Sequence, residues 1–217
     1  EKKGFFGFLY SFVQKIMFRY KLQNLKNHIN KDKIVLDYGS GDGRFAEYLN
    51  QLQIKTITYD PLVNKLDKSE PFGYQITENQ VDTLMMWHVL EHIPDLESSI
   101  KVICNSVKNK GSLIIAVPNI DSFDSKLYKE CWAGLDVPRH LYHFNHESLI
   151  KFIEKHGFIY NYKKPLIFDS FYVSILSEKN RSNPFGILIG LTMGLISNFF
   201  ALFSSNYSSS FYVFTKD

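Results

Sequence analysis

Cysteine is scarce in this sequence, with only Cys104 and Cys131 among 217 residues. The two show no metal-ligand spacing, and so few cysteines exclude a framework of disulfide bonds. We therefore expect a reducing, cytoplasmic compartment. Internal repeats and low-complexity tracts are also absent, and 45% of the residues are hydrophobic. These features predict one globular domain over residues 1–217.

Acidic residues are nearly missing from the first part of the chain. Residues 1–33 contain eight Lys or Arg but only Glu1 and Asp32, a charge of +6 within a total of +3. A nucleic-acid binder spreads its basic residues over a face or along a groove. Here they are confined to one terminal segment that is also rich in Phe and Tyr, so we expect no nucleic-acid partner.

Short apolar runs alternate with amphipathic segments through residues 33–160. This alternation predicts a parallel sheet covered by helices on both faces, with ligands bound at the carboxyl ends of the strands. Asp95 is expected to begin a helix that Gly111 ends, and Asn145 to cap another. The predicted strands are 33–38, 54–59, 81–87, 112–117 and 208–217, and the predicted helices include 43–52 and 145–157.

A glycine-rich loop follows the first predicted strand, in VLDYGSGDGRF at residues 35–45. Glycine lets the backbone turn sharply and approach a ligand closely. A nicotinamide-binding fingerprint would need a third glycine where Arg44 stands, which disfavours an NAD-type oxidoreductase. Asp60 closes the second strand, where a carboxylate can accept hydrogen bonds from ribose hydroxyls.

Four motifs together resemble the class I methyltransferases that depend on S-adenosylmethionine (SAM), most closely the ubiquinone O-methyltransferase-like subgroup. They are VLDYGSGDG, ITYDP at 57–61, VDTLMMWHVLEHIPD at 81–95 and GSLIIAVPN at 111–119, and the resemblance covers residues 30–160. It implies a Rossmann-like three-layer α/β sandwich with a mostly parallel seven-stranded sheet and an antiparallel last strand. It also implies SAM as cofactor, bound by Asp37 near its ammonium group, Gly39 and Gly41 under its methionine part, Asp60 at its ribose, and Trp87 beside it.

Histidines gather in two loops after strands predicted to be adjacent, at 87–92 and 132–146. Methyl transfer to a hydroxyl or a protonated amine is helped by a base, and histidine has a suitable pKa. Each histidine could instead make structural hydrogen bonds within its loop. The candidate bases are, in order, His140, His88 and His143.

Two further residues of the second loop are candidates for binding the substrate. Arg139 can bind an anionic acceptor group, or else form a salt bridge to Asp136 or Glu91. Trp132 is expected to contact the acceptor.

The segment His88-x-x-Glu91-His92 also suggests a metal, because some relatives hold a divalent ion near this motif. His88 replaces a carboxylate there, and hard cations prefer oxygen ligands. We therefore predict no metal, and expect Glu91 and His92 to brace the loop.

Two apolar segments lie outside the motifs: an amphipathic helix within 1–30, and residues 184–203, which carry no charge. The second is long enough to span a bilayer. Its other interpretations are a buried helix, a homodimer contact, or an interfacial or substrate-tunnel helix. We predict that both segments cover the active-site mouth and contact a membrane at its inner face, or a lipid-like substrate.

The sequence thus predicts an enzyme that moves a methyl group from SAM to an oxygen or nitrogen atom of a small or lipid-like acceptor. The alternatives are an NAD-type oxidoreductase and a SAM-binding module without catalysis.

Overall fold

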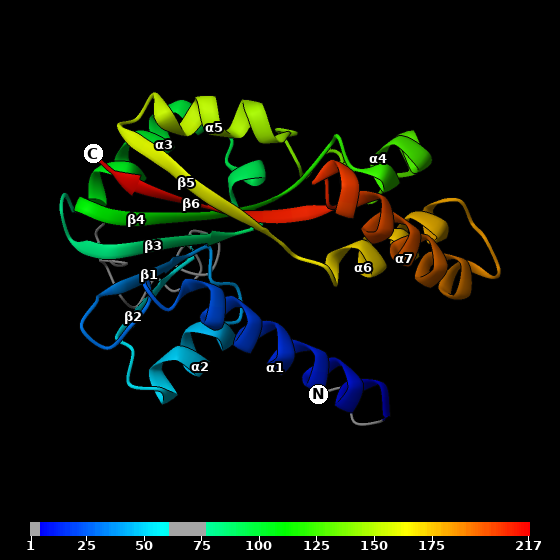
Figure 1. Cartoon of the computed structure of the whole chain (residues 1–217), viewed down its shortest axis with the longest axis horizontal. Helices are drawn as coiled ribbons and strands as arrows, with labels where there is room; N and C mark the ends of the chain where they lie inside the picture. The colour runs from blue at the N-terminus through cyan, green and yellow to red at the C-terminus, as the bar shows by residue number, and fades with distance from the viewer. Residues whose placement is uncertain (1–4, 61–76) are drawn as a thin grey trace.

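A six-stranded sheet forms the centre of the computed structural model, which describes residues 5–60 and 77–217 (Figure 1). The strands lie in the order β2-β1-β3-β4-β6-β5. Their bounds are Val35–Tyr38 (β1), Thr56–Tyr59 (β2), Val81–Trp87 (β3), Val107–Pro118 (β4), Phe158–Pro165 (β5) and Ser209–Lys216 (β6).

Strands β2, β1, β3 and β4 pair in parallel, while β6 is antiparallel to both of its neighbours. The antiparallel last strand is therefore confirmed. The prediction of seven strands is wrong for the described residues, which hold six. That number came from the resemblance alone; the sequence patterns had indicated five strands and missed β5.

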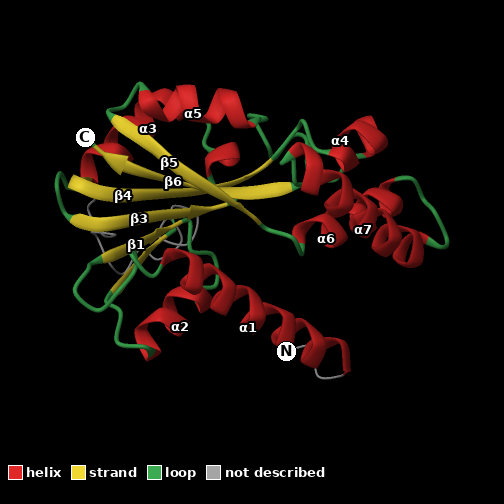
Figure 2. Cartoon of the chain, in the orientation of Figure 1, coloured by secondary structure: helices red, strands yellow, loops and turns green. Residues whose placement is uncertain are grey.

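Helices cover both faces of the sheet and make three layers (Figure 2). Leu96–Ser106 (α3) and His146–Glu154 (α5) pack their apolar side chains on one face. Phe5–Leu25 (α1) and Arg44–Gln51 (α2) lie on the other. As predicted, Asn145 caps α5: its side chain accepts from the backbone N–H of Ser148 at 2.9 Å.

Gly111 does not end a helix, contrary to expectation. The helix α3 stops at Ser106, because from Val107 onward the backbone pairs with β3. A Cβ on Gly111 would lie only 2.6 Å from the Lys108 carbonyl oxygen and 2.9 Å from that of Asp82. The glycine thus permits a close backbone approach inside β4.

A helical hairpin precedes β6 at the carboxyl edge of the parallel strands (Figure 1). It consists of Asp169–Asn180 (α6) and Gly186–Ser204 (α7). The apolar segment 184–203 therefore forms a helix, as its composition predicted, but its partner α6 was not predicted. The short helix Phe123–Tyr128 (α4) packs beside α7 through Phe123 and Phe200, whose ring centroids lie 4.6 Å apart.

Candidate active site

The glycine loop between β1 and α2 is held in a conformation that glycine favours. Gly39, Gly41 and Gly43 all have positive φ angles, of 73°, 56° and 70°. The backbone N–H of Gly39 donates to the Tyr59 carbonyl at 2.6 Å, which fixes the loop against β2. A Cβ on Gly39 would meet the side chain of Val89 at 2.4 Å, whereas one on Gly41 would meet nothing within 4 Å.

A cavity of about 270 Å³ lies over this loop. Four of the five residues that the resemblance assigns to the cofactor line it: Asp37, Gly39, Gly41 and Trp87. The N-terminal helix α1, which the sequence predicted to cover the active-site mouth, closes another side of the cavity. Its lining side chains are Gln14, Phe18 and Lys21.

A cation already lies in this cavity. The Lys21 ammonium is 3.6 Å from the centroid of the Trp87 ring, a cation–π distance. Burial lowers the pKa of Lys21 to about 8, against the opposing effect of Asp169 and Asp37. Burial also raises the pKa of Asp37 to about 6, against the attraction of Lys21.

Asp60 stands directly after β2 and faces the glycine loop. Its Oδ2 accepts a hydrogen bond from the Gly41 backbone N–H at 2.9 Å. The carboxylate predicted to bind ribose thus lies at the loop on which the cofactor was predicted to lie.

These residues fit SAM in charge as well as in shape. SAM carries a sulfonium cation, an ammonium group and a carboxylate. The Trp87 face and Asp37 receive cations, and Lys21 offers a counter-charge to a carboxylate. Gly41 leaves open space on the loop, because no atom lies within 4 Å of where its Cβ would be.

A second cavity, of about 800 Å³, adjoins the first at the end of β3. Trp87 lines the smaller cavity, and the next residue, His88, lines the larger one. The walls come from α6 and from the loop at 130–140, which begins within η2 (Lys129–Cys131). Lining residues include Trp132, Arg139, His140, Asp169, Tyr172 and Lys179.

His88 is held between two carboxylates. Its Nε2 lies 3.1 Å from Asp169 Oδ2, and its Nδ1 lies 3.4 Å from Glu91 Oε1. Burial by itself would lower the pKa of His88, but its ion pairs with the Asp169 and Glu91 carboxylates outweigh burial and raise the pKa to about 10. His88 is therefore an imidazolium at neutral pH, with a positive φ of 55°.

His140 has the opposite electrostatic character. Its Nδ1 lies 2.8 Å from the Gly134 carbonyl, which can only accept, so Nδ1 carries the proton. Burial lowers the pKa of His140, and the Gly134 carbonyl, Glu91 and Asp136 only partly oppose this effect. A neutral ring with Nδ1 protonated leaves a free electron pair on Nε2, the property that a general base needs.

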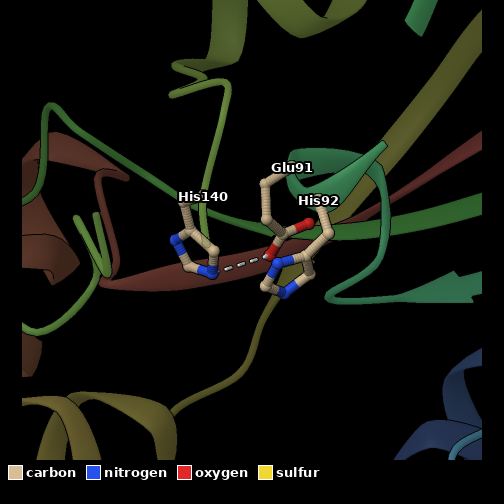
Figure 3. A group of neighbouring side chains, drawn as sticks. All are labelled: Glu91, His92 and His140. Atoms are coloured by element: carbon tan, nitrogen blue, oxygen red, sulfur yellow. Dashed lines mark ion pairs between the residues drawn. The ribbon is translucent and has the colours of Figure 1, made fainter. Parts of the chain in front are cut away.

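Glu91 lies beside His140 and His92 (Figure 3), and it is also the carboxylate near His88 Nδ1. Its side chain is 1% exposed, and its oxygens have no hydrogen-bond donor among the described residues. His140 Nε2 lies 4.0 Å from Glu91 Oε1. Glu91, His92 and His140 each offer a ligand atom, all within 4.8 Å of one another, a grouping that the prediction of no metal did not foresee.

Part of this grouping braces the loop. The Nδ1 of His92 donates to the Arg139 carbonyl at 3.0 Å. The carbonyl of Glu91 accepts the backbone N–H of Leu141 at 2.8 Å. These contacts hold η1 (Leu90–His92) against the loop that carries His140.

The remaining predicted site residues are divided between the cavity and the loop. His143 does not line the larger cavity; its Nε2 donates to the Leu135 carbonyl at 2.9 Å. Arg139 lines the cavity and forms a 2.5 Å ion pair with Asp136. Trp132 is 2% exposed, and its indole N–H donates to Asp124 at 2.8 Å.

Sequence reasoning missed Lys21, Asp169 and Lys179. Asp169 meets His88 across 81 residues of sequence. No local pattern marks such residues.

Comparisons with known proteins bear on the family and the fold. A family model described as a methyltransferase domain matches residues 10–160. A SAM-dependent methyltransferase from Thermotoga maritima has a TM-score of 0.58 at 15% identity, over 97% of each chain. One from Archaeoglobus fulgidus has a TM-score of 0.55 at 18% identity, over 95% of this chain and 100% of that one. No curated protein matches the sequence.

A third structure holds the cofactor itself. The phosphoethanolamine N-methyltransferase 2 of Haemonchus contortus, in complex with SAM, has a TM-score of 0.53 at 17% identity, over 85% of this chain. The present chain spans about half of that enzyme, 48%. These likenesses establish the fold, and the family model covers most of the chain. The protein therefore belongs to the class I SAM-dependent methyltransferases, with SAM as its cofactor.

Proposed function

We propose that this protein transfers the methyl group of SAM to an oxygen or nitrogen atom of an acceptor held in the larger cavity. This proposal rests on the position of two consecutive residues at the end of β3. Trp87 lines the smaller cavity, and His88 lines the larger one. Methyl transfer requires donor and acceptor to be aligned across one short gap, and alignment alone accounts for much of the acceleration.

The acceptor cavity combines an apolar wall with charged groups. Tyr172, Val173 and Leu176 of α6 line it together with Lys179 of the same helix, and Arg139 and the His88 imidazolium add further positive charge. Such a lining suits a small or lipid-like molecule that carries a polar or anionic group near its reacting atom. The motifs at 35–43 and 81–95 support placement in the ubiquinone O-methyltransferase-like subgroup.

His140 is the proposed general base. SAM supplies an electrophilic methyl group when bound, so the acceptor atom must present a lone pair. Nε2 of His140 can take the proton from a hydroxyl or an ammonium group, and Glu91 nearby stabilises the imidazolium that results. His88 holds its proton too firmly for that role and instead supplies a fixed positive charge to the cavity.

Incubation with SAM labelled in its methyl group tests the function directly. A cell extract serves as the source of acceptors, and mass spectrometry identifies the labelled product. We expect label in a small molecule or lipid, and S-adenosylhomocysteine formed in equal amount. Calorimetry with SAM is the companion measurement: tight binding without any labelled product would favour a SAM-binding module without transferase activity.

A further inference from the structure

The helix α7 exposes large apolar side chains over most of its circumference. Phe185, just before it, is 69% exposed, Leu195 is 62%, and Phe203 is 79%. No charged residue occurs from 182 to 215. Other exposed apolar residues of α7 are Ile187, Leu188, Leu191, Phe199, Phe200 and Leu202.

Only a narrow stripe of α7 is buried, and it is made of small residues. Gly190 and Gly194 approach α6 so closely that a Cβ on either would come within 2.9 Å of backbone atoms of Ile175 or Phe171. At about 100° per residue, the buried positions fall within about 80° of arc and the exposed apolar ones spread over about 220°. The buried positions are Gly186, Gly190, Gly194, Ser197 and Ala201.

The width of this exposed arc indicates what covers it. A helix that packs against one protein surface buries a stripe of roughly 100°. The stripe toward α6 already occupies about that much, so one more subunit would leave much of the remaining arc in water. Lipid chains, in contrast, can surround the whole arc.

The geometry points to an interfacial helix rather than a spanning one. By length and hydropathy alone α7 could cross a membrane, and 28% of that window is buried. Yet α6 begins and α7 ends at the same edge of the sheet, so the hairpin returns to the side from which it leaves (Figure 1). Its turn carries Arg181 and Asn183, which disfavour insertion by the tip.

Exposed charges on the segments around the hairpin are mostly positive. Lys126 lies on α4, which packs beside α7, and Lys179 and Arg181 lie at the hairpin turn; all three are exposed. Lys129 and the acidic Glu130 are exposed next to each other after α4. Basic residues beside an apolar helix favour its attachment to an anionic bilayer, because they attract the headgroups.

We propose that the exposed face of α7 docks the protein on an anionic lipid bilayer. This docking is independent of methyl transfer, so its test does not use activity. The purified full-length protein is mixed with vesicles of phosphatidylcholine and phosphatidylglycerol and then separated by flotation. We expect the protein to float with the vesicles.

Two matched double variants locate the contact. Leu195→Gln with Phe199→Gln removes apolar groups from α7, while Val102→Gln with Ile159→Gln removes similarly exposed groups, 55% and 53%, from α3 and β5. We expect the first pair to lower the bound fraction at least tenfold and the second to leave it unchanged. Circular dichroism checks that both variants are folded.

A fluorescent probe gives a second readout. In a Phe199→Trp variant, we expect the added tryptophan emission to shift to the blue on adding vesicles. A Val102→Trp variant should show no shift. The proposal fails if the protein stays in the aqueous fraction, or if both double variants float equally well. It also fails if light scattering shows a dimer that only the α7 variant dissociates.

Discussion

Gly39 is the residue on which the cofactor loop depends most. Its positive φ costs an L residue about 1–2 kcal/mol, and a Cβ would also clash with Val89. Gly157 also has a positive φ, but open space around it, far from the cavity. Gly39→Ala should therefore lower the free energy of unfolding by more than Gly157→Ala, and weaken SAM binding at least tenfold. Chemical denaturation measures the free energy of unfolding, and calorimetry measures the affinity for SAM. Equal losses of stability in the two variants would contradict the role of Val89.

His140 and His143 lie in the same loop and are a natural pair for testing the base. His140→Ala should lower turnover by about 10²–10⁴-fold, the usual contribution of a general base, with little change in SAM affinity. His143→Ala should leave turnover almost unchanged, because its ring only bonds the Leu135 carbonyl. If neither substitution changes turnover, the enzyme acts by positioning alone.

His88 makes stability depend on pH. Its pKa is raised to about 10 in the folded protein, above the usual value near 6.5. The stabilisation is therefore complete below about pH 6.5 and is lost as pH rises toward 10. Thermal denaturation of the wild type and His88→Gln should show a large difference at pH 6 that narrows toward pH 10. A difference constant with pH would show that the His88 ring is neutral in the folded state.

At the scale of elements, one buried carboxylate joins segments distant in sequence. Asp124 of α4 is fully buried and accepts hydrogen bonds from Trp132 Nε1, Ser197 Oγ and Ser208 Oγ at 2.7–2.8 Å. It therefore links the cavity wall, α7 and the start of β6. All three donors lose their partner in Asp124→Ala.

We expect Asp124→Ala to lower the free energy of unfolding by about 3–5 kcal/mol, since each unsatisfied buried donor costs about 1–3 kcal/mol and such losses are not additive. Asp124→Asn keeps an acceptor oxygen and should cost less. Chemical denaturation measures both. Equal losses in the two variants would mean that the charge of Asp124, rather than its hydrogen bonds, carries the stabilisation.

The elements also differ in how far the sequence revealed them. The buried runs of β1, β3 and the second half of β4, and the cap of α5, follow local rules, and their positions were predicted. The strand β5 was missed because Asn161, Lys163 and Lys164 interrupt its apolar pattern. The helix α6 was missed because its packing face is formed by serines, which composition does not mark as buried.

The same distinction holds within the site. Gly39, Gly41 and Asp37 form one continuous motif, and they lie together because they are neighbours in sequence. Lys21 and Asp169 reach the site only through packing of α1 and α6 against the sheet, which no local pattern specifies. The protonation of His88 likewise depends on Asp169. The sequence alone therefore could not show that His88 is a poor candidate for the base.

At the scale of the whole molecule, SAM should stabilise the fold by mass action. At a concentration 100 times its dissociation constant, a ligand adds about 2.7 kcal/mol. For a chain of this size we expect a rise in melting temperature of roughly 5–10 °C, at about 2–4 °C per kcal/mol. NAD at the same concentration should have no effect. If NAD rather than SAM raises the melting temperature, the protein is better interpreted as an NAD-type oxidoreductase.

The two cavities are lined by different segments and come together at the end of β3. This arrangement has a consequence for how the enzyme can acquire new substrates. The donor side is built from α1, β1 and the glycine loop, whereas the acceptor side is built from the loop at 130–140 and from α6. The two sets of segments meet near Trp87 and His88, and Asp169 of α6 also interacts with Lys21 of α1. Replacing the second set by that of another methyltransferase should therefore exchange one substrate for another while the affinity for SAM persists, which makes the molecule a scaffold for engineering new methylations.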